Sequence, residues 1–189
     1  MKPVDKSFTF KYIIHDSWTE TLAGAHYLLS DFEESNKVCD KAHLCRLVLI
    51  SANHLIEKLF FDLAEEALKN QNNTPAEIYN NFEKTTLFTA MRKWPQLLVH
   101  GSAPLSFDVE PLLSADELRK QRNRSIHKES EMVTFEMAKK ALYSAVETCR
   151  VIWKHFHKNK AFKYECILEK YPVMDEGHYS TATNINNVT

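Results

Sequence analysis

The chain has 189 residues, which fits one ordinary domain with a sizeable core. Hydrophobic residues make up 44% of it and only three residues are glycine, which argues against a loop-rich or barrel design. The formal net charge of -1 excludes a uniformly basic protein that coats nucleic acid, so any RNA contact must come from a local cationic patch.

The first half of the chain predicts two long helices behind a short N-terminal segment. Residues 1–15 alternate aromatic and polar side chains, which indicates an irregular, extended segment packed on the domain. Asp16 or Ser17 then caps a helix of about 18 residues. The second helix, roughly Lys41 to Asn70, is apolar over much of its circumference, which is typical of a helix central in its fold or shared with a partner.

The two helices have apolar stripes that we expect to form the core. In chain order these residues are Trp18, Leu22, Ala25, Leu29, Phe32, Leu44, Val48, Leu55, Leu59 and Leu63.

The second half predicts a weaker helix, a loop and two further helices. The weaker helix runs from about Pro75 to Trp94, either continuously or with an interruption near Asn80-Asn81, and stops before Pro95, because a proline restricts the residue that precedes it. Residues 95–113 are predicted to form a connecting loop. A capping box at residues 114–117 opens the next helix, and Thr134 caps a long amphipathic helix after it.

The end of the chain is harder to assign. Residues 158–171 either prolong the last helix or pair with the N-terminal segment. From residue 172 onward the composition is polar and rich in Asn and Thr, which predicts a disordered tail over 172–189. We therefore expect an all-α protein, an up-and-down bundle of four to five helices in a single domain over residues 1–171.

The sequence also predicts the compartment. No apolar run is long enough to span a membrane, and the N-terminus lacks the apolar core of a signal peptide, so we expect a cytoplasmic protein. The cysteines are Cys39, Cys45, Cys149 and Cys166, and no two of them form a Cys-x-x-Cys pair. We therefore expect reduced thiols rather than disulfides or zinc ligands.

The most informative stretch is Arg122-Asn123-Arg124-Ser125-Ile126-His127, near the end of the fourth predicted helix. It lies in the segment Arg119 to Lys128, which holds five Lys or Arg residues and no acidic residue. Arginine is permanently cationic and binds phosphate through a fixed fork of donors. Histidine can take up and return a proton near neutral pH. Together these side chains can break an RNA phosphodiester without a metal ion.

A compact helical domain in which Arg-x4-His precedes a turn and a last long helix resembles the HEPN superfamily. The pattern of that family is an arginine, four to six residues, then a histidine, with a polar residue favoured after the arginine. Arg122, Asn123 and His127 match it residue by residue. The resemblance covers roughly residues 16–158 and includes no nucleotidyltransferase, helicase or ATPase segment, so the chain is similar to a stand-alone HEPN domain.

The resemblance implies an all-helical bundle that forms a homodimer with the motif at its interface. It also implies a metal-independent endoribonuclease of a toxin–antitoxin or antiviral defence system. RNA and an antitoxin protein are the partners that follow. Since the sequence has no glycine-rich phosphate loop and no cluster of carboxylates, we expect no cofactor and no metal ion.

The expected reaction is attack by the ribose 2'-hydroxyl on the adjacent phosphorus, which suits single-stranded RNA. We assign proton transfer to His127, where a positioned histidine contributes about 10²–10⁴-fold, and phosphate stabilisation to Arg122. Asn123 would orient either side chain or the phosphate. The remaining cations of the segment are expected to bind substrate; they are Arg119, Lys120, Arg124 and Lys128.

Helical geometry constrains this site. Residues five apart lie about 140° apart around an ideal helix, so Arg122 and His127 do not share a face. Either the helix loosens before His127, or a second subunit completes the site. We favour the homodimer, which brings two arginines and two histidines into one composite site. On the second helix, Glu57 and His54 are expected to support the site from the cleft or the dimer seam.

Other interpretations of the motif are open. The cationic segment can be a solvated helix face, with His127 favoured at the helix C-terminus by the helix dipole. The same bundle can also be a non-catalytic HEPN-like module that binds RNA, a nucleotide or a partner protein. A third interpretation is a structural dimer whose cationic segment is only surface.

Overall fold

The computed structural model describes residues 16–34, 38–74, 76–78, 80, 85–100, 103–127 and 133–180, without the side chains of residues 38–40 and 125–127. The expected extended segment 1–15 and the last nine residues, 181–189, lie outside the described residues. Within the described ranges every regular element is helical, and no helix is long and apolar enough to cross a membrane. The all-α expectation is confirmed.

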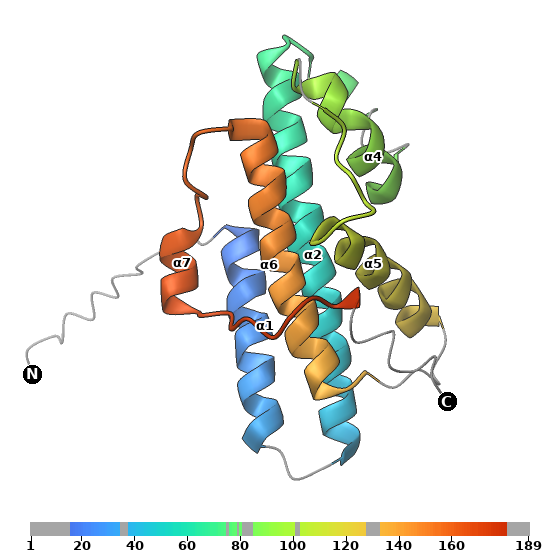
Figure 1. Ribbon diagram of the computed structural model, residues 1–189, viewed down its shortest axis with the longest axis vertical. Coiled ribbons are helices and arrows are strands. Elements are labelled where there is room, and N and C mark those ends of the chain that lie inside the picture. The colour runs from blue at the N-terminus through green and yellow to red at the C-terminus, as the bar shows by residue number, and fades with distance from the viewer. Residues whose placement is uncertain are drawn as a thin grey trace, which may run out of the picture.

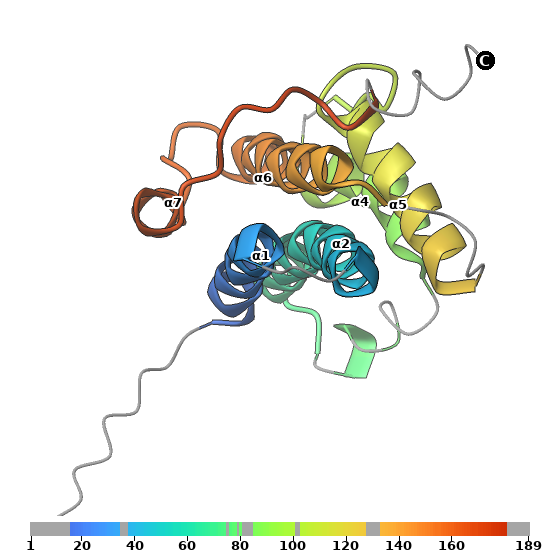
Figure 2. The same ribbon diagram turned by 90° about the horizontal axis from the view of Figure 1, so that it is seen from below.

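Three long helices form the centre of the molecule. They are α1 (Ser17–Glu34), α2 (Val38–Asn70) and α6 (Phe135–His157), and α2 packs against both of the others (Figures 1 and 2). The apolar circumference of α2 is explained by this position, since it meets α1, α6 and the two helices on its far side. Most of the predicted stripe residues are buried; Leu29, Phe32 and Leu44 are only half-buried.

The helices α2 and α6 lie side by side although they are not consecutive along the chain. Cys149 of α6 contacts the carbonyl of Leu55 (Sγ to O, 3.6 Å), and His157 further along α6 approaches Glu66 further along α2 (4.0 Å). The two helices therefore run parallel, as Figure 1 shows. A parallel neighbour needs a long connection, and the chain between residues 70 and 135, which contains α4 and α5, provides it.

Asp16 begins α1, as the sequence predicts. Its Oδ1 accepts the backbone N–H groups of Trp18 (3.0 Å) and Thr19 (3.1 Å) and the hydroxyl of Tyr164 (3.0 Å). Burial alone would raise the pKa of Asp16, but these donors more than offset it, so the pKa lies below its ordinary value. The start of α1 is thereby tied to the turn that precedes α7 (Glu165–Lys170).

Residues 76–78 and 80 are helical, and the helix α4 (Leu87–Leu98) follows the non-helical residues 85–86, which agrees with an interrupted helix. The helix α4 begins at the cap Thr86 and continues through Pro95, where the sequence predicts a stop. A proline inside a helix removes one hydrogen bond. Here Pro95 is buried, its carbonyl accepts the N–H of Val99 (3.0 Å), and only one further turn follows. Burial of the ring therefore stabilises a short extension that the local rule excludes.

The helix α5 (Leu112–His127) also begins earlier than predicted. Ser114, the expected cap, lies inside the first turn and is fully buried. Its N–H donates to Oε2 of Glu110 (3.2 Å), so Glu110 supplies the acceptor for this end of the helix. The hydroxyl of Ser114 accepts the N–H of Ser180 instead (3.0 Å). The capping box is wrong because Ser114 is engaged in a tertiary contact.

Residues 171–180, which we call the strap, correct the predicted tail. The strap leaves α7 and crosses α6 toward α5 (Figure 2). Tyr179 is fully buried, and its N–H donates to Oγ of Ser144 on α6 (2.8 Å). Disorder is therefore the wrong prediction for 172–180. Composition misled here because one large buried side chain and two backbone hydrogen bonds hold an otherwise polar segment.

The segment 158–171 does not prolong the last long helix, and the alternative, pairing with the N-terminal segment, lies outside the described residues. The helix α6 ends at His157, and after a turn the short helix α7 begins. Arg150 of α6 holds α7 through Glu165 (Nη2 to Oε2, 2.8 Å). Cys45 and Cys149 are buried free thiols and Cys166 is an exposed one, whereas the side chain of Cys39 is not among those described.

Candidate functional site

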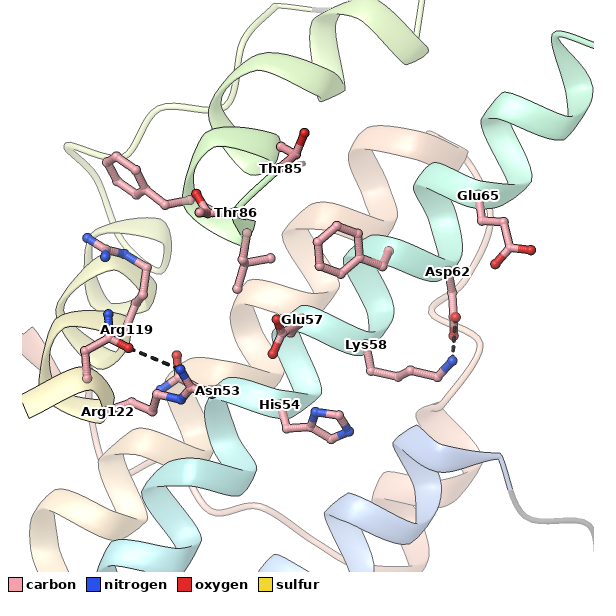
Figure 3. Close-up of a pocket in the computed structure, with 14 residues that line it drawn as sticks. Asn53, His54, Glu57, Lys58, Asp62, Glu65, Thr85, Thr86, Arg119 and Arg122 are labelled. Atoms are coloured by element: carbon pink, nitrogen blue, oxygen red, sulfur yellow. Dashed lines mark hydrogen bonds and ion pairs between the residues drawn. The ribbon is translucent and has the colours of Figure 1, made fainter. Parts of the chain in front are cut away.

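A groove of about 780 Å³ lies between α2, α5 and the beginning of α4 (Figure 3). Five of the predicted site residues line it. From α5 they are Arg119, Arg122 and Asn123, and from α2 they are His54 and Glu57. The fold thus gathers into one groove two sets of residues that are about sixty-five positions apart in the sequence.

The α2 wall carries groups that can exchange protons or accept hydrogen bonds. His54 is exposed and Glu57 is half-buried. Within the described part of the chain, neither side chain forms a hydrogen bond or an ion pair. One turn further, Lys58 and Asp62 form an ion pair with each other (2.6 Å). His54 and Glu57 are therefore the ionisable α2 side chains that remain for an occupant of the groove.

Asn53 fixes α5 against α2 at the floor of the groove. Only 6% of this residue is exposed. Its Nδ2 donates to the carbonyl of Leu118 on α5 (3.0 Å) and to the carbonyl of Leu49 on its own helix (3.4 Å). A buried hydrogen bond between two helices sets their relative rotation, so Asn53 determines which α5 side chains face the groove.

Arg122 and Asn123 lie together on the α5 wall. The guanidinium of Arg122 donates from Nη1 to Oδ1 of Asn123 (3.2 Å). Among the described residues no carboxylate forms an ion pair with Arg122. The Arg122 cation therefore keeps most of its donors for a ligand, and an arginine fork of this kind matches a phosphate group.

Arg119 is held far more rigidly. Its Nε and Nη2 both donate to Oδ1 of Asp116 (3.2 and 3.0 Å), and its guanidinium carbon lies 4.3 Å from the centre of the Phe88 ring. Arg92 contacts the same ring at 4.5 Å. Burial alone would raise the pKa of Asp116, but hydrogen bonds from Lys120 and Arg119 more than offset it, so the pKa lies below its ordinary value.

Acidic side chains pair with part of the cationic segment 119–128, so fewer of its charges are available to a ligand than the sequence indicates. Lys120 pairs with Asp116 (3.1 Å) and Glu117 (2.7 Å), and these partners raise the pKa of Lys120. Arg124 is exposed and does not line the groove, and Lys128 lies outside the described residues. The acids stand one turn before the segment, where i,i+3 and i,i+4 pairs form on a helix.

For His127 the structure describes the backbone and not the side chain. The helix α5 continues through His127, so the alternative in which the helix loosens before this residue is wrong. The side chain of His127 lies outside those described. Its predicted encounter with Arg122, within one subunit or across a dimer, stays a prediction.

Three groove features were missed from the sequence: Asn53, Phe88 and the Asp116 partner of Arg119. A lone amide within a long apolar helix was the available signal for Asn53. For Phe88 the sequence offered only the i,i+4 spacing to Arg92, because its other guanidinium partner, Arg119, comes from a different helix. Within the described residues, no three His, Cys, Asp or Glu side chains gather as a metal-binding cluster.

No protein-family model matches this chain, and no similar protein was found among curated proteins or among solved structures.

Proposed function

We propose that this protein is a HEPN-like, metal-independent endoribonuclease that cuts single-stranded RNA at a composite site of a homodimer. The observation that carries the proposal is Arg122. Its guanidinium lines a groove of about 780 Å³, next to Asn123, and no described carboxylate forms an ion pair with it. Electrostatic stabilisation of a phosphoryl group requires such a cation in a formed cavity.

The reaction is a transesterification in which the 2'-oxygen bonds to phosphorus and the bond from phosphorus to the 5'-oxygen breaks. One imidazole of His127 takes the 2'-hydroxyl proton, and the protonated imidazole of the second subunit gives a proton to the departing 5'-oxygen. Arg122 binds the non-bridging oxygens, on which charge increases. The products are a 2',3'-cyclic phosphate and a 5'-hydroxyl, and the protein regains its protons by exchange between the two imidazoles and water.

The proposed reaction also indicates which RNA is cut and what biological role the protein has. An RNA that is cut through its own 2'-hydroxyl must let the attacking oxygen line up with the leaving group, which a single strand does more readily than a helix. A cytoplasmic enzyme of this kind arrests growth by destroying RNA, so we place the protein among toxins or antiviral defence effectors, with an antitoxin protein as its partner.

The test is RNA cleavage in EDTA, with the ends of the products identified by mass spectrometry. Arg122→Ala and His127→Ala should each lower the rate at least about 100-fold, since each removes one element of the chemistry. Lys154→Ala removes a charge from an exposed position on α6 and serves as the control, with a rate close to that of the unaltered protein. Arg122→Lys should recover only part of the rate, because lysine lacks the planar fork.

One observation favours a second function, a non-catalytic HEPN-like module that binds a partner protein. The groove also carries an acidic group that has no described ion pair, Glu57 on its α2 wall, whereas Glu65 is paired with Lys69 (2.5 Å) and Arg119 with Asp116. Such a mixed surface suits a partner with cations of its own. If the unaltered protein produces no cyclic-phosphate ends in EDTA and still binds through the groove, this function replaces the nuclease.

A further inference from the structure

The amide of Asn53 presents an acceptor to the groove that no described residue satisfies. Its two hydrogen-bond neighbours, the carbonyls of Leu118 and Leu49, are both acceptors, so the amide nitrogen must face them. The oxygen Oδ1 consequently points away from these carbonyls. Both hydrogen bonds of Asn53 within the described residues use Nδ2, which leaves Oδ1 for something else.

Oδ1 is not among the fully enclosed side-chain atoms that lack a partner, so it is open to the groove, and most polar atoms of so buried a residue have a hydrogen-bond partner. Asn53 is 94% buried and still lines the groove. The group that satisfies Oδ1 must therefore carry a donor, and it must be small enough to reach the floor. A hydroxyl meets both conditions, whereas the broad edge of a nucleobase does not fit a site so little exposed.

The position of this acceptor relates it to Arg122. In an α-helix the N–H of residue 122 bonds to the carbonyl of residue 118, which is the carbonyl that Asn53 contacts. The Asn53 amide thus lies beside the turn from which Arg122 extends, and both side chains border the same groove (Figure 3). A ligand with a phosphate at Arg122 has its neighbouring atoms close to Oδ1.

We propose that Oδ1 of Asn53 accepts a hydrogen bond from the ribose 2'-hydroxyl of the nucleotide whose 3'-phosphate is bound by Arg122. The proposal rests on the proposed function, because it takes RNA as the occupant. In RNA the 2'-hydroxyl and the 3'-phosphate stand on adjacent carbons, which matches the adjacency of the two protein groups. Asn53 thereby selects RNA over DNA at the binding step, since DNA lacks this donor, and the hydroxyl turns its single proton from Oδ1 to the His127 imidazole before it attacks phosphorus.

A rival acceptor lies one turn along α2. Glu57 also lines the groove, four residues after Asn53 and on the same face of the helix. Its carboxylate accepts hydrogen bonds more strongly than an amide oxygen. The two acceptors differ in depth, because Glu57 is half-buried near the rim and Asn53 lies at the floor. The experiment has to separate them.

The experiment compares two ligands on several variants of the full-length chain. The ligands are a ten-residue oligouridine and its 2'-fluoro analogue, which keeps the sugar shape but lacks the donor and cannot be cut. All proteins carry His127→Ala to suppress the proposed reaction, and fluorescence anisotropy in EDTA gives Kd. The added variants are Asn53→Leu, Asn53→Ala, Glu57→Gln and Leu118→Ala, and the last weakens the fully buried α2–α5 packing without changing a polar group of the groove.

The expected result is that protein with Asn53 binds the ribose ligand about fivefold more tightly than the fluoro ligand, as one neutral hydrogen bond provides. Both Asn53 variants should bind the two ligands equally. Leu118→Ala and Glu57→Gln should keep the ratio even where absolute affinity falls. The ratio of affinities, not either affinity alone, separates recognition of the hydroxyl from a merely structural role.

Two results would overturn the inference. One is that protein with Asn53 binds both ligands equally. This comparison requires no substitution of Asn53, so it remains decisive even if the Asn53 variants fail to fold. The other is a ratio that survives in Asn53→Leu or Asn53→Ala and disappears in Glu57→Gln. Cleavage is not measured here: a protein that cuts no RNA but shows the Asn53-dependent ratio refutes the nuclease alone.

Discussion

Tyr179→Ala is expected to destabilise the protein by about 3 kcal/mol, although the residue lies near the end of the chain. The side chain is fully buried, and truncation of a buried aromatic residue to alanine costs about 3–5 kcal/mol. We expect the lower end of this range, because a strap that loses its anchor can detach and so relieve the cavity. For a chain of this size the change corresponds to a melting temperature lower by roughly 6–12 °C.

Urea unfolding followed by circular dichroism measures this loss. Met174→Ala is the matched control, since Met174 lies on the same strap and is 70% exposed; it should change stability by less than about 0.5 kcal/mol. The reasoning is refuted if the two variants unfold at the same urea concentration. In that case the burial of Tyr179 contributes nothing to the folded state, and the strap is not part of the cooperative unit.

Three further predictions concern ionisable groups. Asp16→Ala should lower the free energy of unfolding by about 1–2 kcal/mol at neutral pH, because the helix loses its cap. The folded-state pKa of Asp16 lies below its ordinary value, so this contribution should disappear as the pH falls through that lower pKa. Urea titrations in a pH series would detect the loss. Burial lowers the pKa of His157 from 6.5, so the unfolded chain binds the proton first, and stability should fall as the pH drops below that value. His157→Phe should remove this part of the pH dependence. If the variant shows the same dependence of stability on pH, His157 is not its source. Burial raises the pKa of Cys149 to about 12, so iodoacetamide at mildly alkaline pH should label the exposed Cys166 in the native protein and leave Cys149 unlabelled, as peptide mass spectrometry would show; equal labelling of the two thiols would contradict the burial.

The sequence predicts the features of this fold that depend on near neighbours. Asp16 and Thr134 are helix caps as expected, because a cap needs only donors two or three residues away; Oγ1 of Thr134, for example, accepts the N–H of Met137 (3.2 Å). The strap could not be predicted in this way. The partner of Tyr179 is Ser144, thirty-five residues earlier, and nothing in the local composition indicates it.

In the candidate site too, local features could be predicted from the sequence and long-range contacts could not. The Arg122-Asn123 pair and the cations near it are visible in the sequence, and the partner of Arg119 could have been found, since Asp116 stands three residues before it. Asn53 could not be connected to the site, because the carbonyl that it contacts belongs to Leu118, sixty-five residues further on. Long-range pairs of this kind require the packing of α2 on α5.

The bond between Ser180 and Ser114 has a consequence for the order in which the protein matures. These residues are separated by 66 positions, so at a translation rate of about 5–20 residues per second the anchor emerges several seconds after the helix it secures. During that interval α5, which bears Arg119 and Arg122, lacks the hydrogen bond that the N–H of Ser180 donates to its first turn. The wall of the groove formed by α5 therefore gains its last anchor only when Ser180 has been synthesised.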